Sequence, residues 1–373
     1  MTLQICADPG PVRPFGKAEY AGRLATLAAK ALRKGKLDAL IISTEVNRYY
    51  LTGMECSNAL LIISQGKPEF YTDSRYLEAA EKNLKFVKVE KLTKLREFLP
   101  QLAKKRKWKR IGYEGSISAS TLQLYKDNFT AADEWIDAER YIQDMRSIKS
   151  ARELDAIRTA VHTNDMIFSR LMPYVEPGVT EWSLRQKLAH LFIDHSHGEA
   201  FSPIICAAEN ASLCHHKPGL SKIRDNHEVL IDMGCDIQKY KSDMTRTFFF
   251  GKPPKKLLNI YKIVLDANLK AIAAIKPGIA CGKIDTIARN YIKKYGYGRY
   301  FDHGLGHSVG LDIHETPGFA RNNMTILKPG MTLTVEPGIY IPGFGGVRIE
   351  DMIAVTHKAC EVLTTTPKKL LIL

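Results

Sequence analysis

A carboxylate inside an apolar, strand-like segment is the feature that most constrains how this chain folds. Asp232 lies within the segment 229–234 (VLIDMG), where an unpaired charge would be costly. Asp243 lies in a second segment of this kind, 242–248 (SDMTRTF), at a separation that fits two strands holding both aspartates side by side. Two neighbouring carboxylates raise each other's pKa unless a cation neutralises them, so a pair of divalent metal ions is the economical interpretation. A single buried aspartate hydrogen-bonded to the backbone or to Arg246 is the alternative.

Three histidines follow in a glycine-rich segment, 303–315 (HGLGHSVGLDIHE). They are His303, His307 and His314. A lone histidine is usually structural, whereas three in a glycine-rich segment more often bind a metal or a substrate, because glycine lets the backbone approach a bound group closely. This segment therefore strengthens the metal hypothesis.

Two glutamates complete a candidate ligand set. Glu336 and Glu350 each have apolar neighbours at strand-like positions, and the turn-rich segment 342–346 between them lets them face each other across two strands. Two aspartates, two glutamates and a histidine suit two divalent ions bridged by carboxylates, such as Mn, Co or Zn. A structural zinc site would require cysteine ligands, which this pattern does not offer.

The spacing of apolar residues predicts two domains. In the first, strands and helices alternate, which indicates an α/β domain; helices are expected at 18–34, 77–84, 92–103 and 121–129, and strands at 37–42, 49–53 and 59–63. In the second, helices are expected at 150–172, 181–193, 255–275 and 284–295, with strands dominating from residue 333. We place the boundary so that the domains cover residues 1–142 and 143–373.

Composition is that of a globular protein, with 373 residues, 45% hydrophobic and 25% charged. No apolar run is long enough for a membrane helix, and residues 1–15 carry no apolar signal-peptide core, so we expect a cytoplasmic protein without membrane association. The seven cysteines are scattered and form no Cys-x-x-Cys pair, which indicates reduced thiols.

The net charge of +14 raises the question of nucleic acid binding. The densest basic run, 104–110 (KKRKWKR), is either a phosphate-binding patch or a solvated helix end before a strand at 111–113. We favour the helix end and expect no nucleic acid partner, because no nucleic-acid-binding motif accompanies the run.

The order and spacing of these motifs resemble the pita-bread metallopeptidases, the family of methionine aminopeptidase, aminopeptidase P and prolidase. The matching segments of the C-terminal half are 232–234 (DMG), 242–247 (SDMTRT), 303–307 (HGLGH), 336–340 (EPGIY) and 346–351 (GVRIED). The N-terminal half resembles the creatinase-like domain of proline-specific members in 38–42 (DALII), 47–53 (NRYYLTG) and 72–76 (TDSRY). The resemblance thus implies an α/β creatinase-like domain followed by an α+β pita-bread catalytic domain.

The resemblance also implies a role for each candidate residue. The implied metal ligands are Asp232, Asp243, His307, Glu336 and Glu350. Glu336 would also carry the proton from the attacking water to the leaving proline nitrogen.

Four further residues are implied around these ligands. His215 and His303 would line the proline subsite, and His314 would stabilise the tetrahedral intermediate. Arg348 would orient the Asp232 side of the cluster. His216 has no implied role and is expected at the surface.

Three positions depart from the family pattern. Ala208 and Lys239 stand where glycines are usual, which leaves the ligands untouched. Gly318 stands where dipeptide-specific prolidases commonly have an arginine that grips the carboxylate of the product. We therefore expect an Xaa-Pro aminopeptidase, with Xaa-Pro dipeptidase (prolidase) as the alternative, in which Arg321 would substitute for the missing arginine.

The substrates implied are peptides with proline at position two, the metal implied is Mn before Co or Zn, and the expected assembly is a homodimer. A non-catalytic binding relative and a metal-independent, creatinase-like hydrolase are weaker hypotheses, because both would be expected to have lost ligands that this chain retains.

Overall fold

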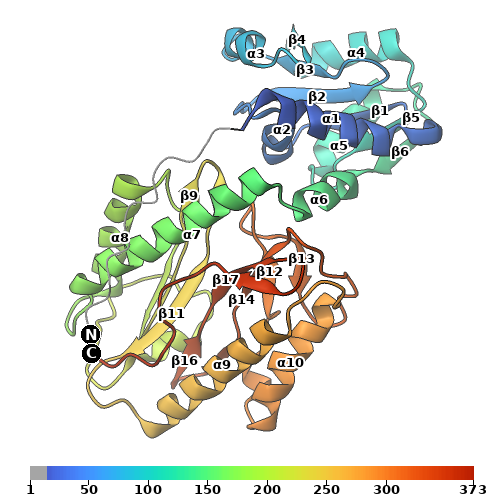
Figure 1. The fold of residues 1–373 in the computed structure, drawn as a ribbon. Coiled ribbons are helices and arrows are strands. Elements are labelled where there is room, and N and C mark those ends of the chain that lie inside the picture. Colours follow the sequence, from blue (N-terminus) through green and yellow to red (C-terminus); the bar gives the residue numbers. More distant parts are fainter. Residues whose placement is uncertain (1–14) are drawn as a thin grey trace. The chain divides into compact units, whose positions relative to one another are not determined.

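The computed structural model describes residues 15–373, so the expectations for the signal-peptide region and for Cys6 lie largely outside the described residues. The chain divides into two compact units between Arg146 and Ser147 (Figure 1). Each unit is built around its own sheets and its own apolar core.

The N-terminal unit is a six-stranded mixed sheet in the order β4-β3-β2-β1-β5-β6. Its strands are β1 (Ala39–Ile42), β2 (Ala59–Ser64), β3 (Glu69–Thr72), β4 (Lys88–Lys91), β5 (Arg110–Tyr113) and β6 (Glu134–Asp137). Its helices are α1 (Lys17–Ala31), α2 (Glu45–Thr52), α3 (Leu77–Asn83), α4 (Leu95–Arg106), α5 (Ala119–Asn128) and α6 (Glu139–Ser147). The alternation of strands and helices is the α/β pattern that the sequence predicts.

The segment 49–53 is helical, and the strand predicted there is wrong. It forms the end of α2, which stops at Gly53 in the left-handed region, with φ of 70°. Tyr49 and Tyr50 favour strands in isolation, but a glycine after the last helical turn is a helix-stop signal that outweighs them.

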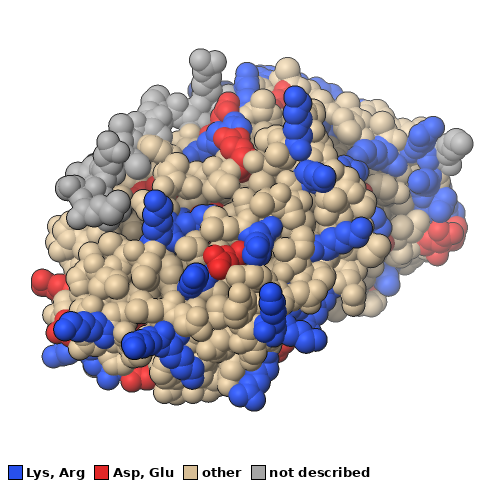
Figure 2. All heavy atoms as spheres, turned by 60° about the horizontal axis from the view of Figure 1, so that its bottom comes forward, with Lys and Arg blue, Asp and Glu red and all other residues tan. Residues whose placement is uncertain are grey.

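The basic run 104–110 is a helix end followed by a strand, as the favoured interpretation predicts. Helix α4 ends at Arg106, whose guanidinium pairs with Glu69, and β5 begins at Arg110. Trp108 between them is buried and stacks on Phe129. On the face drawn in Figure 2, Lys and Arg side chains outnumber Asp and Glu but are scattered among uncharged residues rather than gathered into one stripe.

In its described residues, the C-terminal unit contains four main helices and several small sheets. The helices are α7 (Ala151–Leu171), α8 (Glu181–His195), α9 (Lys255–Ala274) and α10 (Cys281–Lys294). One sheet has the order β11-β8-β7, from β7 (Ile204–Ala207), β8 (Glu228–Met233) and β11 (Met244–Phe249). The other has the order β13-β12-β14-β17-β18, from β12 (Gly306–Ser308), β13 (Glu315–Phe319), β14 (Thr332–Val335), β17 (Asp351–Val355) and β18 (Cys360–Val362).

Two short hairpins connect these strands. The hairpin of β9 (Asp236–Ile237) and β10 (Tyr240–Lys241) lies between β8 and β11, and that of β15 (Gly338–Ile341) and β16 (Gly345–Arg348) lies between β14 and β17. Lys239, in the turn of the first hairpin, has φ of 70°, and Ala208 has φ of 54°. Both departures from glycine therefore occupy left-handed positions that a glycine adopts at lower cost.

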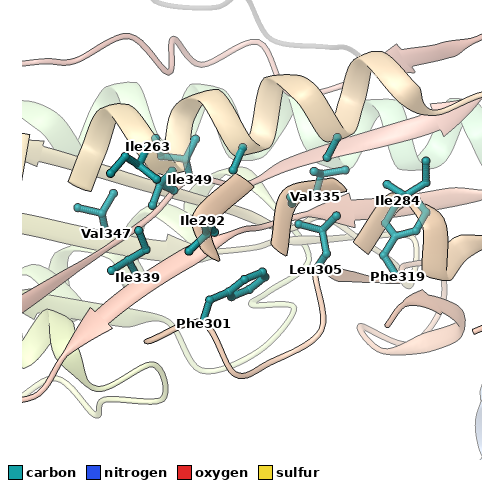
Figure 3. Packing of buried hydrophobic residues seen from close by; sticks show 14 of the residues in the cluster. Ile263, Ile284, Ile292, Phe301, Leu305, Phe319, Val335, Ile339, Val347 and Ile349 are labelled. Carbon is teal, nitrogen blue, oxygen red and sulfur yellow. The ribbon is translucent and has the colours of Figure 1, made fainter. Parts of the chain in front are cut away.

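The strands of this unit lie between two helix pairs, α7 with α8 and α9 with α10 (Figure 1). Each pair covers one apolar core. Figure 3 shows the core beneath α9 and α10, a single cluster that includes Ile263 of α9, Ile292 of α10, Val335 of β14 and Ile349. The opposite core joins α7 and α8 to β8 and β11 through residues such as Leu188 and Ile231. Each sheet packs on its own pair of helices, so the polar residues at the ends of its strands are held in place between the two cores.

The strand register decides where the acidic residues point. Strand β8 pairs antiparallel with β11, with Asp232 opposite Thr245, so Asp243 lies two positions farther along the same face instead of directly beside Asp232. The ladders β14–β17 and β15–β16 continue one register, with Val335 opposite Asp351 and Gly338 opposite Arg348. Glu336 therefore lies across from Glu350, as predicted.

Six cysteines fall within the described residues, and none of these forms a disulfide. Between residues 15 and 373, every helix is too short or too polar to cross a bilayer.

Candidate metal centre and catalytic cavity

One cavity of about 520 Å³ brings all the predicted site residues together. Its lining includes His215, Asp232, Asp243, His303, His307, His314, Glu336, Arg348 and Glu350. These residues come from segments more than 130 positions apart in the sequence, and the strands of the C-terminal unit and their connections hold them around a common space.

The tightest group is formed by Asp243, His307 and Glu350, whose potential ligand atoms all lie within 4.8 Å of one another. The Nε2 atom of His307 lies 3.5 Å from the Asp243 carboxylate and 3.4 Å from that of Glu336. His307 is in β12, whereas Asp243 precedes β11, so this group joins the two sheets.

Burial and mutual repulsion destabilise the charged forms of the carboxylates. Burial, and then the charges of Glu350, Asp232 and Glu336, raise the pKa of Asp243 well above its usual range. Burial and the charges of Glu336 and Asp232 do the same to the pKa of Glu350. Burial raises the pKa of Glu336 to about 8. A cluster of this kind is stable in its charged form only when cations share the space.

Two carboxylate oxygens in the cavity are available as metal ligands. Oδ1 of Asp232 and Oε1 of Glu350 are buried, and neither has a hydrogen-bond partner among the described residues. Buried oxygens without partners are costly, and divalent cations prefer oxygen ligands of this type together with imidazole nitrogen. The residues present therefore fit divalent metal ions.

Arg348 is the partner of Asp232. Its Nη2 donates to Oδ2 of Asp232 at 2.6 Å, and its Nε donates to the Thr245 hydroxyl at 2.9 Å. The predicted alternative, in which Arg246 pairs with Asp232, is wrong, because the guanidinium of Arg246 points to Asp351 at 2.8 Å. Arg348 leaves one Asp232 oxygen free to face the cavity.

Thr245 connects the arginine to the metal-ligand candidates. Its hydroxyl donates to Oε2 of Glu350 at 2.7 Å while accepting from Arg348. This fixes one oxygen of Glu350 and leaves Oε1 without a hydrogen-bond partner among the described residues.

The three histidines of the glycine-rich segment differ in environment. Burial lowers the pKa of His303 to about 4, and burial together with the nearby His314 lowers that of His307 to about 4, so both rings are neutral at pH 7. A neutral imidazole is the form that binds metals. His314 is exposed at the cavity, and its ring meets that of His307 edge-on at 4.3 Å.

Tyr340 is a cavity residue for which the sequence predicted no role, although it belongs to the 336–340 motif. Its hydroxyl lies 2.9 Å from Nε2 of His303 and accepts from Nη1 of Arg348 at 3.0 Å. Tyr340 therefore couples the His303 wall of the cavity to the Asp232 side.

His215 lines the cavity from the connection between β7 and β8. The neighbouring His216 was expected at the surface, which is wrong: it is half-buried, and its Nε2 lies 2.8 Å from Oε2 of Glu181. The fully buried Glu181 also accepts from the backbone amides of Ala207 and Gly219 at 2.8 and 2.9 Å. A glutamate at the first turn of α8 thus fixes the segment that carries His215.

Neither Gly318 nor Arg321 places a guanidinium in the catalytic cavity, where it could bind the carboxylate of a dipeptide. Gly318 lies in β13 with φ outside the left-handed region, and a Cβ there would come 3.0 Å from the carbonyl oxygen of Gly306. Arg321 does not line the catalytic cavity; it borders a separate depression and lies 3.7 Å from Asp302. In this structure Arg321 does not substitute for the missing arginine.

Carboxylates and imidazole gathered around one cavity in a fold of paired helices and sheets define a metal-dependent hydrolase. The chain belongs to metallopeptidase family M24: the profile of that family matches residues 155–357, and the creatinase/prolidase N-terminal domain matches residues 23–148. The predicted fold class, a creatinase-like domain followed by a pita-bread catalytic domain, is confirmed, and the protein is a metallopeptidase that uses divalent metal ions.

Similar proteins act on Xaa-Pro bonds. The chain is 34% identical to an Xaa-Pro dipeptidase of Pyrococcus furiosus, over 92% of this chain and 97% of the relative. An Xaa-Pro dipeptidase from Bacillus anthracis superposes with a TM-score of 0.89 at 33% identity, over 96% of this chain and all of the other. An X-Pro aminopeptidase from Thermotoga maritima superposes with a TM-score of 0.82 at 28% identity, over 90% and 98% of the two chains.

These comparisons support the alternative, the Xaa-Pro dipeptidase, better than the aminopeptidase favoured by Gly318. The absence of an arginine at one position is therefore a weak guide to substrate length.

Proposed function

We propose that this protein is an Xaa-Pro dipeptidase that hydrolyses the bond before proline with two divalent metal ions. The observation that supports this most directly is the convergence of four carboxylates and His307 in one cavity that four further histidines also line. Among the described residues, two of the carboxylate oxygens, Oδ1 of Asp232 and Oε1 of Glu350, have no hydrogen-bond partner. The names of the most similar relatives support the dipeptide as substrate.

The proposed ligands are Asp232, Asp243, His307, Glu336 and Glu350. Divalent ions bound there would acidify a water molecule so that it attacks a carbonyl near neutral pH.

The chain's own residues perform the remaining tasks. Glu336, which lines the cavity beside His307, accepts the proton of the attacking water and passes it to the proline nitrogen. His314, exposed beside His307, donates to the carbonyl oxygen as it becomes negative. Arg348 holds Asp232 in place without occupying both of its oxygens.

His215 and His303 are proposed to form the proline subsite. His303 is fixed by Tyr340 on one ring nitrogen, and Nδ1 lies 2.7 Å from the Gly304 carbonyl oxygen on the other. A ring held at both nitrogens offers its face and edge as a rigid apolar wall, which suits the pyrrolidine ring of proline.

We further propose Mn as the native metal, a homodimer as the assembly and the cytoplasm as the location. The oxygen-rich ligand set suits Mn, and the six cysteines of residues 15–373, none of which forms a disulfide, suit a reducing compartment. Metal analysis of protein purified without added metal, and sedimentation equilibrium, test the first two. Zn in place of Mn, or a monomer at micromolar concentration, would contradict them.

The central experiment compares Gly-Pro with Arg-Pro-Pro as substrates of the Mn-loaded protein. We expect faster hydrolysis of the dipeptide, and we expect Glu336→Gln, which keeps the size but not the basicity of the side chain, to lose hydrolysis of both. A preference for the tripeptide would establish the aminopeptidase instead, and the absence of any hydrolysis by metal-loaded protein would refute a proline-specific peptidase.

A further inference from the structure

A dipeptidase must distinguish a free carboxylate from the amide that follows proline in a longer peptide. This requirement rests on the function proposed above. Gly318 supplies no charge, and Arg321 borders a separate depression. The cation that recognises the carboxylate must therefore come from another residue of the catalytic cavity.

Among the described residues, the Lys and Arg side chains that line this cavity are those of Lys217 and Arg348. Arg348 is fully engaged: its guanidinium donates to Asp232, Thr245 and Tyr340, and it is 3% exposed. Lys217 is exposed to the solvent in the cavity, and in the described part of the chain it has no ion-pair partner. It is thus the cation that remains available to a substrate.

The backbone around Lys217 is held in place on both sides. His216 before it and the amide of Gly219 after it both bond to Oε2 of the buried Glu181. Pro218 follows directly and confines the backbone of Lys217 to extended conformations. A flexible side chain on a fixed backbone keeps its ammonium group within reach of one region of the cavity.

Lys217 also lies close in sequence to the proposed proline subsite. His215, two residues before it, lines the same cavity. The carboxylate of a dipeptide is attached to the proline ring itself, so a group that binds it must lie beside the residues that contain the ring.

We propose that Lys217 is the residue that recognises the free carboxylate of an Xaa-Pro dipeptide and so determines the preference for dipeptides. The contact is a charge-assisted hydrogen bond from an ammonium to a carboxylate, and it is lost when the carboxylate is replaced by an uncharged amide. Such contacts change affinity by about tenfold or more.

The test compares Gly-Pro with Gly-Pro-amide, which differ only in this charge, as substrates of the metal-loaded protein. We expect Lys217→Met to lower kcat/KM for Gly-Pro by about tenfold or more, chiefly through KM, because the contact is present before and during the reaction. The value for Gly-Pro-amide should change by less than about twofold. Lys217→Arg should retain the preference for the dipeptide, and Lys217→Glu should reduce it further than Lys217→Met.

Lys222→Met is the matched control. Lys222 is an exposed lysine five residues away that does not line the cavity, so its removal changes the net charge equally but should leave both rates unchanged. An equal loss on both substrates in Lys217→Met, or a dipeptide preference that survives it, would overturn the assignment of Lys217 while leaving the proposed dipeptidase intact. An unmodified protein that hydrolyses both substrates equally would overturn both.

Discussion

Glu350→Gln is expected to stabilise the metal-free protein and to destabilise the metal-loaded one relative to the unmodified chain. Potential ligand atoms of Glu350 and Asp243 lie within 4.8 Å of each other, and two full charges at that distance repel by about 3 kcal/mol at an effective dielectric constant of about 20. Glutamine removes this repulsion but retains an oxygen that accepts the hydrogen bond from Thr245.

The effect has a defined pH dependence. The folded-state pKa of Glu350 is raised well above its ordinary value of 4.5, so the folded protein binds more protons than the unfolded chain at intermediate pH. Metal-free, unmodified protein therefore loses stability as the pH rises from about 4.5 towards that raised pKa. The advantage of Glu350→Gln should be small at pH 5 and should approach about 3 kcal/mol as the pH rises.

Divalent metal should reverse the order. A metal at about one thousand times its Kd adds about 4.1 kcal/mol to the unmodified protein, which exceeds the advantage of about 3 kcal/mol that the variant has without metal. The variant has lost a ligand charge and should gain much less from the metal. The assay is urea unfolding with EDTA and with Mn, at pH 5 and pH 8.

Asp351→Asn is the control, because it removes the same charge one residue away but is expected to lower the stability of the metal-free protein instead of raising it. Although burial favours its neutral form, Arg246 and Lys368 hold the pKa of Asp351 below its usual range. This variant should lose stability at pH 5 and pH 8 alike, with or without metal. Should metal-free Glu350→Gln prove less stable than the unmodified protein at pH 8, the carboxylates do not repel as the geometry requires, and the argument fails.

Three further changes test other parts of the structure. His314→Ala should lower kcat by about 10²–10³ with little change in KM, and an effect confined to KM would place His314 in ground-state binding. Gly318→Arg should depress hydrolysis of dipeptides and tripeptides alike, because its Cβ would come 3.0 Å from the Gly306 carbonyl beside His307; a selective gain on dipeptides would contradict this. Glu228→Gln should raise the unfolding free energy at pH 8 by up to about 3 kcal/mol but hardly at pH 5. Burial raises the pKa of Glu228 to about 7, so at pH 8 the folded protein carries a free-energy cost for this carboxyl that unfolding removes. Equal effects at both pH values in urea unfolding would rule this out.

Most of the candidate site could be predicted from the sequence because each ligand leaves a local trace. An acidic residue within an apolar strand is costly without a cation, so Asp232 and Glu350 are conspicuous in the order of residues alone. The register that places Glu336 across from Glu350 follows from one turn-rich segment between two strands.

The contacts between distant segments could not be predicted in this way. Arg246 and Arg348 have similar sequence surroundings, and only the folded strands show that the first pairs with Asp351 and the second with Asp232. His216 looked like a surface residue because its partner, Glu181, lies 35 positions earlier on a helix. Local propensity also misplaced 49–53, where the glycine stop signal was present but the tyrosines outweighed it in the prediction.

The acidic residues of the cavity and the groups proposed to contact substrate are carried by different kinds of backbone. Asp232, Glu336 and Glu350 lie in paired strands or directly at their ends, where a shift of one residue would turn every side chain to the opposite face. His215, Lys217 and His314 lie on the connections between strands. If the proposed roles hold, the hydrolytic chemistry depends on the paired strands, whereas the choice of peptide depends on connections that can be exchanged. Replacing the connection between β7 and β8 with that of an aminopeptidase, while retaining Glu181 as its anchor, is consequently the shortest route to a protein with the same metal chemistry and a different range of substrates.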